Sequence, residues 1–168
     1  QANRYQNAQL LLEYGVAVDI RDESLRTPLH IAAVHSNADM IALLIHSDAD
    51  LNAADNAGWT PLMHACFCTN IDAVELLLAE KADRSARNFE GQLALHVAAM
   101  AGSTAVVQLL LDAEFGIDEQ DGNGQTALQI AAAWNHDDLG IYLLASGATS
   151  NIQDIHGDQC AHLAAYAN

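Results

Sequence analysis

Apolar and polar stretches alternate regularly along the whole chain. An apolar stretch such as PLHIAAV (28–34) is followed by a leucine-rich stretch such as IALLI (41–45). Apolar residues three and four positions apart share one face of a helix. The polar, glycine-containing stretch after each pair, such as EKADRSARNFEG (80–91), is typical of a turn or short hairpin. The pattern therefore predicts pairs of short helices separated by turns.

The pattern repeats every 33 residues. Five stretches align without a gap: RTPLHIAAVHSN (26–37), WTPLMHACFCTN (59–70), QLALHVAAMAGS (92–103), QTALQIAAAWNH (125–136) and DQCAHLAAYAN (158–168). A further Leu10-Leu11-Leu12 run lies in the same phase. We therefore expect a single repeat domain over 1–168, with a partial repeat 1–21, repeats 22–54, 55–87, 88–120 and 121–153, and a partial repeat 154–168. Because both ends fall inside repeats, we expect the chain to be part of a longer protein.

Residue types at fixed positions explain how each unit folds. Threonines at the start of the apolar stretch are suited to cap a helix, and prolines fit the first helical position, where no N–H is needed. Each first helix is predicted to be about two turns long. The residues that predict these features are Thr27, Thr60 and Thr126 with Pro28 and Pro61; the boundary residues Asp22, Asp55, Asn88, Asp121 and Asp154; and the turn glycines Gly58, Gly91, Gly124 and Gly157. Leu25 departs from the turn-glycine pattern, and Gly140 is expected to weaken a second helix.

The charge distribution limits the class of partner. The formal net charge is -16, from 22 Asp and Glu against 6 Lys and Arg, and all six basic residues lie within the first 87 positions. This charge disfavours nucleic acids and anionic membranes, and favours a protein or peptide with basic and apolar residues. An acidic surface that only keeps the protein soluble explains the charge as well.

Three cysteines, an odd number, favour a reducing compartment, so the protein is expected to be intracellular, cytoplasmic or nuclear. The uncharged run 91–111 contains His, Gln and a Gly-Ser-Thr break, which argue against membrane insertion.

Taken together, the pattern D-x-x-G-x-T-P-L-H-x-A-A followed by L-L at period 33 resembles the ankyrin repeat family. The resemblance covers the whole chain. It implies an all-α solenoid of stacked antiparallel helix pairs, with β-hairpin fingers projecting to one side and a concave surface formed by fingers and first helices. Parts of the sequence are also similar to the ankyrin domain of Notch-type receptors and to the regulatory ankyrin subunits of protein phosphatase 6.

The stretch GWTPLMHACFCTN (58–70) contains the residue types of a metal or catalytic site. His64, Cys66 and Cys68 lie two positions apart on a predicted helix, so Cys66 faces away from the other two. No orienting group or oxyanion donor accompanies them. We therefore predict no catalytic residues, no metal site, no cofactor and no enzymatic activity. The family resemblance gives His30, His96 and His162 a structural role, as hydrogen-bond partners of the backbone in the neighbouring turn.

The resemblance also implies where a partner binds. Family recognition positions lie in the fingers and at the end of each first helix, and here they hold five of the chain's nine aromatic residues. Aromatic residues and Met are typical interface anchors, although some could instead fold onto neighbouring repeats. The preferred anchors are Trp59, Phe67, Met100 and Trp134, then Phe89 and Tyr166, with Arg26, His35, His64, Cys68, Gln92 and Gln125 as further contact positions.

These features predict a non-enzymatic interaction scaffold or adaptor. The alternative is the reader or regulatory module of a multidomain enzyme that recognises a basic or methylated peptide. Trp59 matches one position of the methyl-lysine cage known in that class, whereas His64, Phe67 and Val97 do not match. The resemblance also implies possible hydroxylation of Asn52 and Asn151, which have Leu44 and Leu143 eight residues earlier.

Overall fold

The computed structural model describes residues 2–35 and 37–166, with residues 2–4 described by their backbone only. Ten helices lie within this part of the chain. They are α1 (Ala2–Glu13), α2 (Pro28–Val34), α3 (Ala38–His46), α4 (Pro61–Phe67), α5 (Ile71–Ala79), α6 (Ala94–Ala101), α7 (Thr104–Asp112), α8 (Ala127–Ala133), α9 (Asp137–Ala145) and α10 (Cys160–Tyr166).

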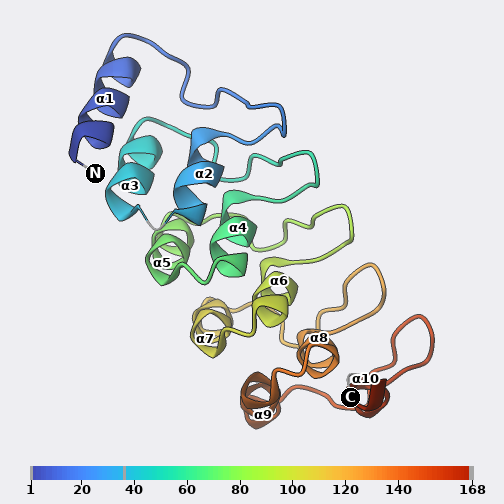
Figure 1. Cartoon of the computed structure of the whole chain (residues 1–168). Coiled ribbons are helices and arrows are strands. Elements are labelled where there is room, and N and C mark those ends of the chain that lie inside the picture. The colour runs from blue at the N-terminus through green and yellow to red at the C-terminus, as the bar shows by residue number, and fades with distance from the viewer. Residues whose placement is uncertain (1, 36, 167–168) are drawn as a thin grey trace.

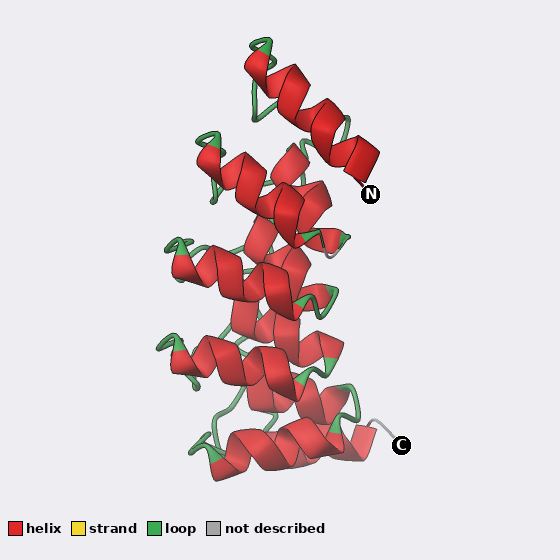
Figure 2. Ribbon diagram, turned by 90° about the vertical axis from the view of Figure 1, so that its left-hand side faces the viewer, coloured by secondary structure: helices red, strands yellow, loops and turns green. Residues whose placement is uncertain are grey.

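The helices form two parallel columns. Helices α2, α4, α6, α8 and α10 each contact the next in one column, and α1, α3, α5, α7 and α9 form the other. The loops that connect successive pairs project to one side of the stack, next to the first column (Figure 1). Figure 2 shows the second column stacked in front of the first. We call the surface formed by the loops and the first column the inner face. The predicted all-α solenoid of helix pairs is confirmed.

The predicted helix starts are present. Thr60 and Thr126 precede α4 and α8, and their hydroxyls accept hydrogen bonds from the backbone N–H groups of Met63 and Gln129. Thr27 is the N-cap of α2. Helices of this length are unstable alone in water, so they depend on packing against their neighbours. In the run 91–111, Gly102 takes a left-handed conformation at the end of α6 and separates it from α7.

The core runs continuously along the stack between the two columns. Equivalent leucines of the first helices are buried in every full repeat, and small residues beside them let the helices approach closely. The leucines are Leu29, Leu62, Leu95 and Leu128. The buried small residues beside them are Ala33, Cys66, Ala99 and Ala131, of which Ala131 lies one position earlier in its repeat than the other three. The second column contributes Leu44, Leu77, Leu110 and Leu143. Since each repeat buries its apolar faces against adjacent repeats, stability arises from stacking.

The loops are tight turns rather than strand-paired hairpins. Asp55 N–H donates to the carbonyl of Trp59 (3.0 Å), and Gly58 N–H donates to that of Asp55 (3.0 Å). Neighbouring loops are joined by backbone bonds such as that from Phe89 N–H to the carbonyl of Ala57 (3.1 Å). Among residues 2–35 and 37–166 no strand is present, because this spacing of bonds does not form a ladder. The predicted fingers are therefore present in position, without strand pairing.

Candidate protein-interaction face

An Asp or Asn side chain organises each loop of the inner face. Asp55 Oδ1 accepts hydrogen bonds from the backbone N–H groups of Ala57 (2.8 Å) and Trp59 (2.9 Å). Such Asp-to-backbone bonds close a turn without strand partners. They fix the backbone of Trp59, so the start of the loop determines where this aromatic side chain lies.

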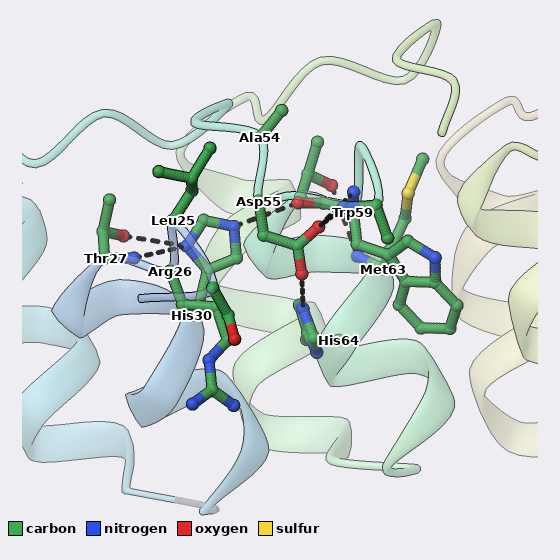
Figure 3. A network of polar contacts seen from close by, with 12 residues as sticks. Leu25, Arg26, Thr27, His30, Ala54, Asp55, Trp59, Met63 and His64 are labelled. Atoms are coloured by element: carbon green, nitrogen blue, oxygen red, sulfur yellow. Dashed lines mark hydrogen bonds and ion pairs between the residues drawn. The ribbon is translucent and has the colours of Figure 1, made fainter. Parts of the chain in front are cut away.

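The second oxygen of the same carboxylate binds a side chain of α4. His64 Nε2 lies 2.9 Å from Asp55 Oδ2 (Figure 3). Burial raises the pKa of Asp55, but the hydrogen bonds from His64 and from the two backbone N–H groups outweigh this effect and hold its pKa below the ordinary value. The pair anchors the loop to the helix, and it accounts for the one histidine that interrupts an otherwise apolar sequence column.

Three rings cluster around this pair. The Trp59 ring centroid lies 5.3 Å from that of His64 and 5.5 Å from that of Phe67. His30 meets His64 edge-on at 5.5 Å. Such distances and edge-to-face angles are favourable for aromatic contacts. Phe67 is 49% exposed while Trp59 is partly buried against the core, so the cluster presents an apolar surface at the inner face.

His30 connects this cluster to the preceding repeat. Its Nδ1 accepts a hydrogen bond from the backbone N–H of Thr27 (3.0 Å), so Nε2 carries the proton and donates to the carbonyl of Trp59 (3.0 Å). Burial lowers the pKa of His30, which keeps the ring neutral. His96 Nδ1 accepts the equivalent bond from Leu93 N–H, and its Nε2 donates to a different carbonyl of the next loop, that of Glu119 (2.9 Å). The predicted role of these histidines in bonding the neighbouring turn is present in both.

The remaining anchor candidates do not form one cluster. Met100 is partly buried and accepts a weak hydrogen bond at Sδ from Gln92 Nε2 (3.6 Å). Trp134 is 57% exposed directly after α8. Phe89, in a loop, and Tyr166, in α10, are also exposed. Among the described residues, the ring contacts therefore gather around Trp59, while Trp134, Phe89 and Tyr166 are exposed outside this cluster.

The polar candidates differ in how freely they can reach a partner. His35 and Cys68 are exposed. Arg26 is bound to the carboxylate of Asp22 (2.8 Å). Gln92 is buried and hydrogen-bonded to Asn88. Its side chain can therefore contact a partner only if it breaks this hydrogen bond and turns outward. Gln125 is partly buried.

The thiol of Cys66 in the stretch 58–70 is not placed for nucleophilic chemistry. Cys66 is fully buried, and burial strongly raises the pKa of its thiol, which disfavours the nucleophilic thiolate. In the described part of the chain, no group of three or more His, Cys, Asp or Glu side chains could hold a metal ion. Over the same residues, no helix combines the length and apolar character needed to cross a bilayer.

The two asparagines proposed for hydroxylation are both exposed. Asn52 Oδ1 accepts a hydrogen bond from the backbone N–H of Asp83 (2.8 Å). The backbone carbonyl of Asn151 accepts one from Gln159 (3.3 Å). Their modification stays a prediction.

Comparison with known proteins agrees with this geometry. A family model described as ankyrin repeats (3 copies) matches residues 1–88 and 80–154. The chain belongs to the ankyrin repeat family. Ankyrin repeats are generally protein–protein interaction modules. The chain is similar to human ankyrin repeat domain-containing protein 63, with 44% identity over 57 residues, which is 34% of this chain and 15% of that protein. It is also similar to zebrafish (Danio rerio) protein fem-1 homolog A, with 48% identity over 50 residues, 30% of this chain and 8% of that protein.

Sequence reasoning missed the contribution of the boundary aspartates to the ankyrin inner face. It assigned Asp55 to the turn alone, whereas the carboxylate also binds His64. The available signal was the position of His64, where the other repeats have Ile31, Val97, Ile130 and Leu163. A polar residue in an apolar column requires a nearby partner, and the boundary Asp was the candidate.

Proposed function

We propose that this ankyrin array is a non-enzymatic interaction scaffold that holds a segment of a partner protein across its inner face. The observation that supports this proposal is the packed cluster of Trp59, His64 and Phe67, which leaves Phe67 half exposed on that face. Aromatic residues that are held in place lose little entropy on binding and commonly act as anchors. Trp134, 57% exposed two repeats further along the stack, supplies a second anchor.

The charge of the array defines the partner. Its net charge of -16 favours a basic segment and raises the rate of encounter with it. Apolar residues of that segment contact Phe67 and Trp134, and basic residues face the acidic loops. A partner of this kind is a protein or peptide, not a nucleic acid. We place the array inside the cell, in the cytoplasm or nucleus.

The test compares the wild type with two variants for binding to partner proteins captured from a lysate and then purified. Trp59→Ala combined with Trp134→Ala is expected to weaken binding at least about tenfold, since truncated anchors typically cost 1–2 kcal/mol or more. Ile141→Ala is the matched control, because Ile141 is an exposed apolar residue of α9 in the other column. Binding that survives the double substitution would exclude this face as the site.

Recognition of a methylated lysine stays the alternative. A cage of this kind surrounds the cation with aromatic faces, whereas Trp59 and Phe67 meet edge-on at 79°. Titration of a basic peptide in trimethylated and unmodified forms separates the two functions. A strong preference for the methylated form would favour the reader module.

A further inference from the structure

Each loop of the inner face begins with an Asp or Asn side chain that has two separate tasks. One oxygen accepts hydrogen bonds from two backbone N–H groups and closes the turn. This holds for Asp22, Asp55, Asn88, Asp121 and Asp154. The second side-chain atom is left for another partner.

In the first three loops, the chain itself supplies that partner. Asp22 Oδ2 accepts from Arg26 Nε (2.9 Å) and Nη2 (2.8 Å). Asp55 Oδ2 lies 2.9 Å from His64 Nε2. In the third loop the boundary residue is an amide, and Asn88 Nδ2 donates to Gln92 Oε1 (2.9 Å). The two carboxylates are thus matched by basic side chains, and the amide by an amide.

The fourth loop breaks this pattern. Asp121 is only 8% exposed, and its Oδ2 is buried without a hydrogen-bond partner among the described residues. The place of Arg26 is taken by Gln125, whose amide interacts with the carboxylate of Asp154 in the next loop. The place of His64 is taken by the apolar Ile130. A buried carboxylate oxygen without a donor is unfavourable, so this site is suited to a donor from outside the chain.

Among the described residues, no Lys or Arg side chain binds this carboxylate oxygen. The sequence has no Lys or Arg after Arg87. Arg87 itself binds the carbonyls of Gly91 (2.6 Å) and Gln120 (2.8 Å) and the carboxylate of Glu119 (2.9 Å). The half of the array from residue 88 onward carries ten acidic residues, which reinforces a negative potential around Asp121.

We propose that Asp121 is a receptor for a basic side chain, in the first place an arginine, of a partner segment bound across the inner face. This inference rests on the proposed function and names one of its specific contacts. The arginine takes the position relative to Asp121 that Arg26 takes relative to Asp22. Since Oδ2 is covered, nearby side chains such as that of Gln125 change rotamer when the partner binds, as is common at interfaces.

The chain itself provides two matched variants for the test. Asp121→Asn removes the charge and should preserve the loop, because Asn88 closes its own turn with the same two backbone bonds and pairs with Gln92, the equivalent of Gln125. Ile130→His fills the site from within, because it copies the relation between His64 and Asp55.

The first experiment titrates the wild type with N-acetyl-arginine amide at constant ionic strength. The NMR signals of the Asn123 and Gln125 backbone N–H groups, which donate to Asp121 Oδ1, report on the site. We expect saturable shifts with a Kd on the order of 10 mM, smaller shifts with the lysine analogue, and none with the uncharged citrulline analogue. Both variants should abolish the response. A wild-type response that is absent, or equal for citrulline, would overturn the inference and leave an ordered water as the partner of Asp121.

The second experiment uses peptides selected from a random display library on the wild-type array. We expect them to contain a basic residue whose change to Ala weakens binding about tenfold to the wild type and not to Asp121→Asn. Selected peptides that depend on Trp59 and Trp134 but bind Asp121→Asn equally well would overturn the inference and leave the proposed function intact. If no selected peptide depends on Trp59 and Trp134, the proposed function is contradicted. The titration with N-acetyl-arginine amide then tests the Asp121 site by itself.

Discussion

His96 and Gln129 stand at equivalent positions of successive repeats and make equivalent hydrogen bonds. His96 Nδ1 accepts from Leu93 N–H (3.1 Å), and its Nε2 donates to the carbonyl of Glu119 (2.9 Å). Gln129 Oε1 accepts from Thr126 N–H (3.0 Å), and its Nε2 donates to the carbonyl of Ile152 (3.3 Å), which is the equivalent of Glu119, and also to that of Asp158 (2.8 Å). An amide therefore replaces the neutral imidazole in both bonds. A protonated imidazole at position 96 cannot make both bonds, because its Nδ1–H would face the N–H of Leu93.

This equivalence predicts that His96→Gln reduces the loss of stability in weak acid. Burial lowers the pKa of His96 from its ordinary value of 6.5, so the unfolded chain binds the proton at higher pH than the folded one. The free energy of unfolding is then greatest above pH 6.5 and falls as the pH drops through that value towards the folded pKa. The wild type should lose more stability between pH 7.5 and about 5 than His96→Gln, as measured by urea unfolding.

His35→Gln is the control for this measurement, because His35 is exposed. It should retain the pH dependence of the wild type. An identical pH dependence in His96→Gln would show that the buried imidazole does not titrate on unfolding.

The helix pairs were predictable from local sequence, whereas the side-chain contacts of the inner face depend on residues that meet only in the folded chain. Thr60 and Pro61 specify a helix start through bonds within a few residues, so their role was predictable from the pattern. The partner of His64 is Asp55, nine residues earlier across a turn, and no local rule specifies it. The strand-free loops were also not predictable from the repeat, because turn and hairpin share the same residue preferences.

The Asp55–His64 pair predicts that His64→Val raises the pKa of Asp55. Burial, which raises this pKa, is now outweighed by the hydrogen bonds, of which that from His64 is the largest. Without it, the NMR titration of the Asp55 carboxyl should move towards or above the ordinary value of 3.8. At neutral pH the variant should be less stable by about 1 kcal/mol. This difference should shrink as the pH falls below 3.8 and through the folded pKa, since both states then bind the proton.

His35→Val serves as the comparison, because it removes an exposed histidine without touching Asp55. An unchanged Asp55 titration in His64→Val would mean that the two backbone N–H groups alone set its pKa.

Helix α9 offers a site for stabilisation. A Cβ added at Gly140 would meet no atom within 4 Å, and glycine inside a helix costs about 1 kcal/mol relative to alanine. Gly140→Ala should therefore raise the free energy of unfolding by about that amount, with slower amide hydrogen exchange in α9. Gly124→Ala is the opposite control, since Gly124 has φ +73° and an added Cβ would lie 3.0 Å from the Ile155 nitrogen. It should destabilise the array, and a gain in both variants would contradict this explanation.

The first loop carries strain that a single substitution can remove. Leu25 has φ 60°, in the left-handed region, where the equivalent Gly58, Gly91, Gly124 and Gly157 also have positive φ. This conformation costs a residue with a side chain about 1–2 kcal/mol. Glycine adopts it without this cost, but it makes the unfolded chain more flexible and so offsets part of the gain in stability. Because Leu25 is almost half exposed, little packing is lost with its side chain. Leu25→Gly should stabilise the protein by about 0.5–1 kcal/mol in urea unfolding. Leu25→Ala keeps the strain and loses the side chain, so it should give no gain, and equal stabilisation by both would show that the backbone at position 25 is not strained.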